Sequence, residues 1–332
     1  MNYSIASIRS ISCLLVLITH ISAVFYIDAF EFWHVSLGYL NQLSRFGTPM
    51  FCVITGFLFA KYFYGHLNHQ AFYRSRIEKI CIPYLVWSMV YIVIMYFIYP
   101  NLFNRFIQFP ISNLLTGKVF YHLYFISVIC QFCLMFPILC LFKKINIIIL
   151  LCFALCINFI SLQLLHHDLK WSFLADRAFL GNWIFYFIFG IFFYQLPKFH
   201  LKNFVRIFIP FCILLAISLE FYFSSALFDS TRPANLIYIP ALFLFLYQFF
   251  NKFQSSILLT IGHYSMGIYL IHPLIIMFIK HWIPSQLLHH FPILSFIALY
   301  IATLTICLIL CHYISKSSLS KYVITTPQQH KP

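Results

Sequence analysis

Long apolar runs recur along the whole chain, and they constrain its fold more than any other feature. Each run has roughly 17–25 residues, the length that a helix needs to cross ~30 Å of hydrocarbon. Hydrophobic residues make up 62% of the 332 positions and charged residues only 8%, whereas about a quarter of a soluble domain is charged. The alternating polar and apolar segments of an outer-membrane barrel are absent. The sequence therefore predicts an all-α, polytopic integral membrane protein.

About ten transmembrane helices are expected, one for each run. The runs lie near residues 7–27, 46–63, 80–99, 122–142, 145–165, 179–197, 204–224, 236–251, 257–279 and 291–314. The longest polar intervals between them are 28–45, 64–79 and 100–121. We therefore expect one transmembrane domain over residues 1–315 and a short cytoplasmic tail over residues 316–332.

The basic residues predict the orientation of this bundle. With a cytoplasmic N-terminus and alternating spans, fourteen of the 21 Lys and Arg residues fall inside and seven outside, as the positive-inside bias requires. Asp28, Glu31, Asp168, Asp176 and Asp229 all fall outside. The first run has no basic segment before it, which predicts an uncleaved helix. We expect both termini in the cytoplasm of a bacterium, with the chain in the inner membrane.

The net charge of +14 is explained by this topology, so no nucleic-acid partner is needed. A basic inner surface instead suits anionic membrane lipids. The eleven cysteines lie in or at the ends of the runs. Cys130 and Cys133 form an isolated C-x-x-C inside a helix, without the second ligand pair of a zinc site. Membrane packing is the favoured role for these side chains, and no metal is expected.

Two ionisable residues, Arg9 and His20, fall inside the first run, where such side chains are costly and usually face a cavity or a partner. At ~100° and ~1.5 Å per residue, they share one helix face and lie about 16 Å apart along the axis. Arg9 is then at the cytoplasmic mouth and His20 more than halfway across. One ligand entering from inside can reach both. Alternatively, Arg9 is an interfacial anchor and His20 bonds to a neighbouring helix.

Other polar residues are expected at a similar depth. His122 begins the fourth run, and His272 lies in the outer half of the ninth. An imidazole acts as acid or base near neutral pH. Glu220 lies near the outer end of the seventh run, and Arg177 near the start of the sixth. Glu220 can orient a histidine or pair with Arg177, although a solvated helix end is the favoured interpretation.

The densest cationic cluster lies in the second inner loop and leads into the third run. It contains Arg74, Arg76 and Lys79, and Tyr84 follows. Guanidinium groups bind phosphate through paired hydrogen bonds, so this cluster is a candidate site for a cytoplasmic cofactor. Basic inner loops also arise from topology alone.

Five segments, in order from residue 9 to residue 273, resemble the acyltransferase-3 family of membrane O-acyltransferases. They are the R-x10-H pair of Arg9 and His20, Arg45–Phe51 with Ile54–Leu58, Arg76–Tyr84, His122–Phe125 with Pro137, and Ser265–Pro273. The chain is most similar to short, single-domain members of this family, which modify or help export surface polysaccharide and include the intercellular-adhesin type. Thr55, Tyr124 and Lys79 depart from the usual Ser, Trp and Arg. Lys79 lacks the bidentate fork, which weakens the expected cofactor contact there.

The resemblance implies transfer of an acyl group, most often acetyl, from cytoplasmic acyl-coenzyme A to a sugar hydroxyl. The acceptor would be a surface polysaccharide, its lipid-linked precursor or a peptidoglycan-like glycan. His20 would be the general base or a transient acyl carrier, with Arg9 near the pantetheine arm. The remaining expected catalytic residues are His122, His272 and Glu220. Those expected to bind the cofactor are Arg74, Arg76, Lys79 and Tyr84.

Two other functions fit the composition. An exporter or flippase for a glycan or lipid-linked sugar would use the polar cluster as a pathway, and the abundant aromatic side chains would line it. A structural subunit of a polysaccharide synthase would need no catalytic histidine. Polysaccharide-synthesis partners or a homo-oligomer fit any of these functions.

Overall fold

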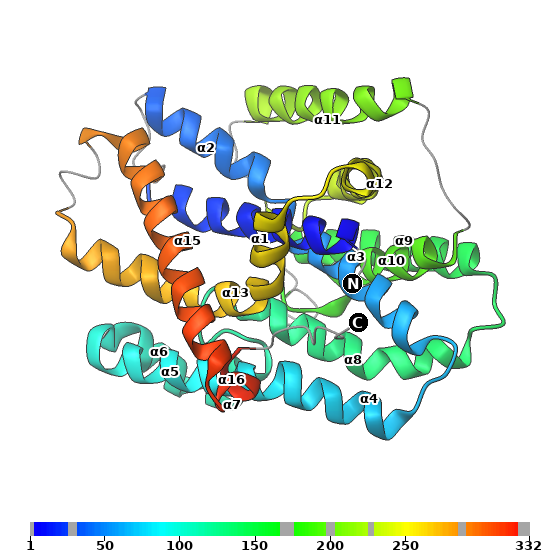
Figure 1. Ribbon diagram of the computed structural model, residues 1–332, viewed down its shortest axis with the longest axis horizontal. Helices are drawn as coiled ribbons and strands as arrows, with labels where there is room; N and C mark the ends of the chain where they lie inside the picture. The colour runs from blue at the N-terminus through cyan, green and yellow to red at the C-terminus, as the bar shows by residue number, and fades with distance from the viewer. Residues whose placement is uncertain are drawn as a thin grey trace. The chain divides into compact units, whose positions relative to one another are not determined.

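The computed structural model describes residues 3–25, 32–166, 176–196, 203–224, 229–284 and 290–324 (Figure 1). Over these residues the protein is all-α and contains no strand, which confirms the predicted fold class. Asp28, Glu31 and Asp168, which entered the predicted topology, lie outside the described residues, as does the tail from residue 325 onward.

Each of the ten predicted runs coincides with a helix. These helices are α1 (Tyr3–Ser22), α3 (Gly47–Phe63), α5 (Ile82–Ile98), α8 (Tyr124–Leu141), α9 (Ile147–His166), α10 (Ile184–Gln195), α11 (Asn203–Ser224), α12 (Asn235–Lys252), α13 (Ser256–Trp282) and α15 (Pro292–Lys316).

Within the described residues, seven helical segments are long and apolar enough to cross a membrane, and the apolar stretches Ile184–Gln195 and Phe208–Phe223 are shorter. A multi-pass membrane protein follows, while the number of about ten spans stays a prediction.

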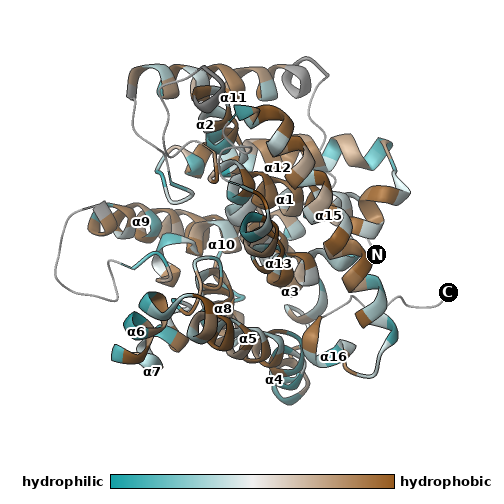
Figure 2. Cartoon of the chain, turned by 90° about the vertical axis from the view of Figure 1, so that its left-hand side faces the viewer, coloured by the Kyte–Doolittle hydropathy of each residue, from teal (hydrophilic) through white to brown (hydrophobic). Residues whose placement is uncertain are grey.

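The predicted polar intervals also contain helices. These are α2 (Phe32–Ser44), α4 (His69–Arg76), α6 (Pro100–Gln108) and α7 (Pro110–Leu115). A π-helix, η1 (Ile77–Cys81), joins α4 to α5, a 3-10 turn, η2 (Leu180–Asn182), precedes α10, and α16 (Ser320–Val323) follows α15. Figure 2 shows hydrophobic residues along most helices, with hydrophilic ones gathered in short helices such as α4 and α6.

The chain divides into two compact units. Over the described residues, the first unit comprises residues 3–25, 32–51, 203–224, 229–284 and 290–317, and the second comprises residues 52–166, 176–196 and 318–324. The expected site residues are divided between them: Arg9, His20, Glu220 and His272 lie in the first unit, and the rest lie in the second.

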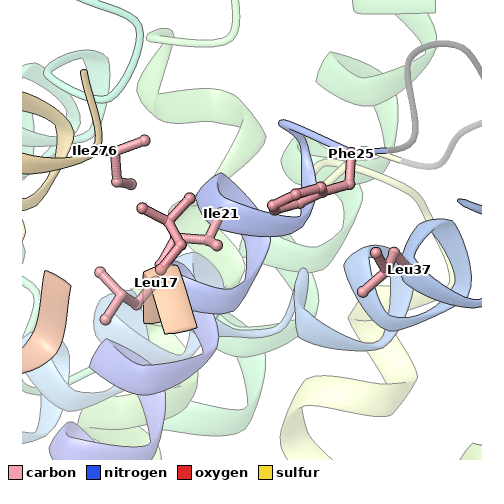
Figure 3. Close-up of a cluster of buried hydrophobic side chains, with 6 residues drawn as sticks. Leu17, Ile21, Phe25, Leu37 and Ile276 are labelled. Atoms are coloured by element: carbon pink, nitrogen blue, oxygen red, sulfur yellow. The ribbon is translucent and has the colours of Figure 1, made fainter. Parts of the chain in front are cut away.

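In the first unit, α1 packs against α13, α12, α2 and α15. Small residues allow the close approach of α1 and α13, as is usual between membrane helices. A methyl group on Gly262 would lie 2.5 Å from the Ala6 carbonyl oxygen. Ser10 Oγ also donates to the carbonyl of Leu258. A buried apolar cluster closes the other end of this contact (Figure 3), with Leu17, Ile21, Phe25, Leu37, Ile276 and Leu299.

In the second unit, two glycines allow the C-terminal part of α3 to cross α10. A methyl group on Gly56 would lie 2.0 Å from the Phe187 carbonyl oxygen, and one on Gly190 would lie 2.1 Å from that of Val53. Stacked rings then fill the space beside the crossing, where the Phe132 and Phe187 centroids are 3.8 Å apart. No larger side chain fits at either glycine without separating the two helices.

Candidate active site

A pair of histidines lies where α1 and α13 run side by side. The ring centroids of His20 and His272 are 5.2 Å apart, with 32° between the ring planes. His272 is buried and His20 is half-buried. The sequence predicted both as catalytic residues, and the structure brings these two residues together.

The tautomer of His272 follows from its backbone contact. Its Nδ1 lies 3.0 Å from the Ile268 carbonyl oxygen. Since a carbonyl only accepts hydrogen bonds, Nδ1 carries the hydrogen and Nε2 of the neutral ring carries the lone pair. His272 therefore has one nitrogen fixed by its own helix and one suited to proton exchange.

Arg9 lies on α1 and is half-buried. Its charge is near enough to His263 of α13 to interact with it electrostatically. Residues later in α1 contact residues later in α13, from Ser10 with Leu258 to His20 with His272. The two helices are therefore parallel.

Glu220 belongs to a polar cluster between α11 and α12. Its Oε2 lies 2.9 Å from Arg232 Nη1, and Tyr238 donates to its Oε1 at 3.0 Å. The side chain of Arg232 is 8% exposed and that of Glu220 is 32% exposed. Arg232 Nε also donates to Asn235 Oδ1 at 3.1 Å, and its guanidinium lies 5.8 Å from the centroid of the Phe46 ring. The carboxylate of Glu220 therefore has a cation beside it and both oxygens engaged.

Arg177, one of the alternative partners considered for Glu220, lies in the second unit. Its guanidinium is 5.4 Å from the centroid of the Tyr124 ring. The nearby backbone is held by buried amides: Asn182 Nδ2 donates to the Asp176 carbonyl at 2.9 Å, and Ser161 Oγ donates to Asn182 Oδ1 at 2.7 Å. Asn182 therefore stabilises a turn between apolar helices, where unpaired backbone groups are costly.

His122 also lies in the second unit, just before α8. It is buried, and the rings of Tyr91, Phe120 and Tyr121 lie around it at centroid distances of 5.2, 5.8 and 5.6 Å. The Tyr91 and Phe120 rings stack on each other at 4.4 Å. The structure therefore places His122 in an aromatic environment.

The basic segment before α5 is built around a π-helix. η1 separates Arg74 and Arg76 from Tyr84, and such irregular turns are frequent at functional sites. The guanidinium of Arg76 lies 5.0, 5.4 and 5.6 Å from the ring centroids of Phe59, Phe63 and Phe72. Its Nη2 donates to Ser75 Oγ at 3.0 Å. Among the described residues, its buried Nε has no hydrogen-bond partner.

The other basic-segment residues have different surroundings. Arg74 is exposed and pairs with Glu78 at 3.0 Å, one helical turn away. Lys79 is half-buried. The buried Tyr84 donates its hydroxyl hydrogen to the Leu114 carbonyl, which links α5 to α7. Arg74, Arg76 and Lys79 thus present three cations within two turns of helix, and Tyr84 supports the segment from within.

Two polar residues stand out in the structure although the sequence did not single them out. Asn41 is fully buried at the contact of α2 with α1, inside an interval expected only to be polar. Arg232 is buried in the Glu220 cluster, although the sequence indicated only an outer charge. No group of three or more His, Cys, Asp and Glu residues in the described part of the chain is arranged to hold a metal ion.

Comparison with protein families matches the chain to a family model described as an acyltransferase domain, over residues 2–312. The match spans both units and includes every expected site residue. Comparison with curated proteins and with solved structures gives no match.

Proposed function

Because the chain belongs to the acyltransferase-3 family, we propose that it moves an acyl group from acyl-coenzyme A to a hydroxyl group of a surface glycan. Acetyl is the proposed acyl group, and the acceptor is a polysaccharide or its lipid-linked precursor. The proposed location is a bacterial inner membrane, with both termini in the cytoplasm. The observation that carries the chemistry is the contact of His20 with His272.

The proposed reaction needs one base. His20 removes the proton from the acceptor hydroxyl, whose oxygen forms a bond to the acyl carbon while the bond from that carbon to the coenzyme A sulfur breaks. The departing thiolate takes up a proton. In the two-step route, a His20 nitrogen first receives the acyl group and then gives it to the hydroxyl. In both routes the Nδ1–H of His272 is held by the Ile268 carbonyl, and its Nε2 lone pair can exchange a proton with His20.

The proposed donor site is the basic segment of the second unit. Arg74, Arg76 and Lys79 provide the positive charge for the phosphates of coenzyme A. Tyr84 supports this segment through its bond to Leu114. Arg9, on the same helix as His20, is the proposed neighbour of the pantetheine arm.

Glu220 and His122 receive structural parts in this proposal. Both oxygens of Glu220 are engaged, by Arg232 and Tyr238, so its carboxylate stabilises the contact of α11 with α12. His122 packs among aromatic rings and supports the start of α8.

The test uses membranes that contain wild-type or variant protein, supplied with acetyl-coenzyme A labelled in the acetyl group. His20→Ala and His20→Gln should lower transfer of label to glycan by roughly 100- to 10,000-fold, the range that general bases contribute. His281→Gln is the matched control, because His281 lies exposed on α13. Unchanged labelling in both His20 variants, at equal protein levels, would remove His20 from the chemistry. Glycan export without use of the thioester would identify an exporter.

A further inference from the structure

A buried amide joins the last turn of α1 to α2, next to the histidine pair. Asn41 is fully buried in the first unit. Its Nδ2 donates to the Thr19 carbonyl at 2.7 Å and to Ser22 Oγ at 2.9 Å. These two partners lie immediately before His20 and two residues after it, so both amide hydrogens are bound to the turn that carries the imidazole.

The oxygen of the same amide is held by an arginine one turn later on the chain. Arg45 donates to Asn41 Oδ1 from Nε at 3.0 Å and from Nη2 at 2.8 Å. An amide offers two hydrogens and one oxygen with two lone pairs. Every hydrogen-bonding site of Asn41 is therefore filled, and the amide can adopt only one orientation. The cation also polarises the amide and strengthens its donation to α1.

A second bond supports the same crossing. Thr19 Oγ1 lies 2.7 Å from Ser44 Oγ, and Ser44 Oγ also contacts the Asn41 carbonyl oxygen at 2.8 Å. The Thr19 carbonyl also accepts from Ala23 N and from Ser22 Oγ, both at 3.3 Å, so the shorter bond from Asn41 adds a tie between this helix end and α2. In an apolar surrounding, such a polar crossing has few competing partners and fixes the rotation of the helix end.

We propose that Asn41 is a positioning residue for the acyl transfer: by holding Thr19 and Ser22, it keeps the intervening His20 beside His272. Arg45 acts through Asn41 by fixing its amide. This inference rests on the proposed function, because it assigns Asn41 to the geometry of a base whose chemistry is acyl transfer.

The decisive substitution is Asn41→Asp, which keeps the size of the side chain and its contact with Arg45. It replaces the donor toward the Thr19 carbonyl with a second oxygen, so that two acceptors face each other. The last turn of α1 should then shift. A displacement of about 1 Å of a catalytic group costs about 100-fold, so kcat for labelled glycan should fall roughly 10- to 100-fold while KM for acetyl-coenzyme A stays within about twofold.

Asn235→Asp is the matched structural control. Asn235 is also fully buried in the first unit, donates to a carbonyl, that of Ser230, at 2.8 Å, and accepts from an arginine, Arg232. Its substitution creates the same conflict of acceptors away from His20. Both variants should lower the thermal unfolding temperature in detergent, but Asn235→Asp should keep kcat per folded protein within about twofold.

Arg45→Gln covers the case in which Asn41→Asp does not accumulate. Arg45 is half-buried, so its removal disturbs the packing less. Loss of the fork frees the amide to rotate, and kcat should fall about three- to tenfold with KM for the donor unchanged.

The outcomes separate the two proposals. Wild-type protein that does not transfer acetyl from acetyl-coenzyme A overturns the proposed function. Active wild type with unchanged kcat in Asn41→Asp, or in Arg45→Gln where only that variant folds, overturns the positioning role. A kcat loss equal to that of Asn235→Asp also overturns it, because it would reflect general destabilisation.

Discussion

The histidine pair of the first unit and the basic segment of the second unit are built in contrasting ways. His20 and His272 lie on two parallel helices that touch through Gly262 and Ser10. Their neighbours fix the helix end and the tautomer. Backbone contacts therefore determine where the imidazoles stand before any substrate arrives.

The cations of the basic segment are instead already engaged with neighbours that a ligand must share or displace. Arg74 pairs with Glu78, and Arg76 packs against three phenylalanine rings. An exposed ion pair contributes little, about 0–1 kcal/mol, so phosphate can replace Glu78 at low cost. Under the proposed function, the first region has a fixed geometry for acyl transfer, and the second holds cations that can bind the donor reversibly. Substitutions in the first should therefore change kcat and those in the second should change KM.

The largest effect in this comparison is expected at His272. His272→Ala should lower kcat for acetyl transfer roughly 100-fold, because it removes the nitrogen that shares protons with His20. His272→Gln, whose amide reaches about as far as Nε2, should lose about tenfold. KM for acetyl-coenzyme A should stay within about twofold in both. Steady-state kinetics on purified protein measure these values.

His281→Gln on the same helix is again the control and should behave as wild type. If His272→Ala instead raised KM for the donor and left kcat intact, the histidine pair would belong to binding. The contrast between the two regions would then be wrong.

A smaller effect is expected at Arg76. Arg76→Lys keeps the charge but loses the planar group that stacks on Phe59, Phe63 and Phe72 and the fork that binds phosphate. KM for acetyl-coenzyme A should rise about five- to tenfold with kcat within about twofold. Titration of the donor at saturating acceptor measures both.

Arg74→Lys is the companion variant, since Arg74 is exposed and keeps a possible ion pair with Glu78 as lysine. Its KM should change by no more than about twofold. A loss of thermal stability in Arg76→Lys without any change in KM would mean that the aromatic contact of Arg76 is structural and that the donor binds elsewhere.

Much of this arrangement could be predicted from the sequence. The ten apolar runs predicted the ten main helices, because run length and the near absence of charge leave few alternatives in a membrane. The spacing of Arg9 and His20 on one face was predictable, since helix geometry is regular. The sequence predicted only that His272 lies at a depth similar to that of His20. It could not predict their contact, because no local pattern shows which helices pack together.

The remaining features depend on contacts between distant residues. The helix α2 lies in an interval expected only to be polar, and its Asn41 is buried because its amide is hydrogen-bonded to the end of α1. The partner of Glu220 is Arg232, twelve residues later, and an aromatic contact with Phe46 completes that site. Arg76 was expected to bind phosphate. The packing of three phenylalanine rings around it could not be predicted from their positions in the sequence.

The smallest effect is expected where the basic segment departs from the family pattern. Lys79 is a point charge, whereas arginine, the usual residue there, offers a planar fork for phosphate. Lys79→Arg should therefore lower KM for acetyl-coenzyme A about twofold to threefold, with kcat unchanged, since the histidine pair is not touched. Lys79→Gln should raise KM by a similar factor. Because Lys79 is half-buried within η1, the added length of arginine tests whether that turn leaves room for a second fork. If Lys79→Arg raised KM while Lys79→Gln left it unchanged, the lysine would anchor the segment at the membrane surface, and the donor phosphates would depend on Arg74 and Arg76 alone.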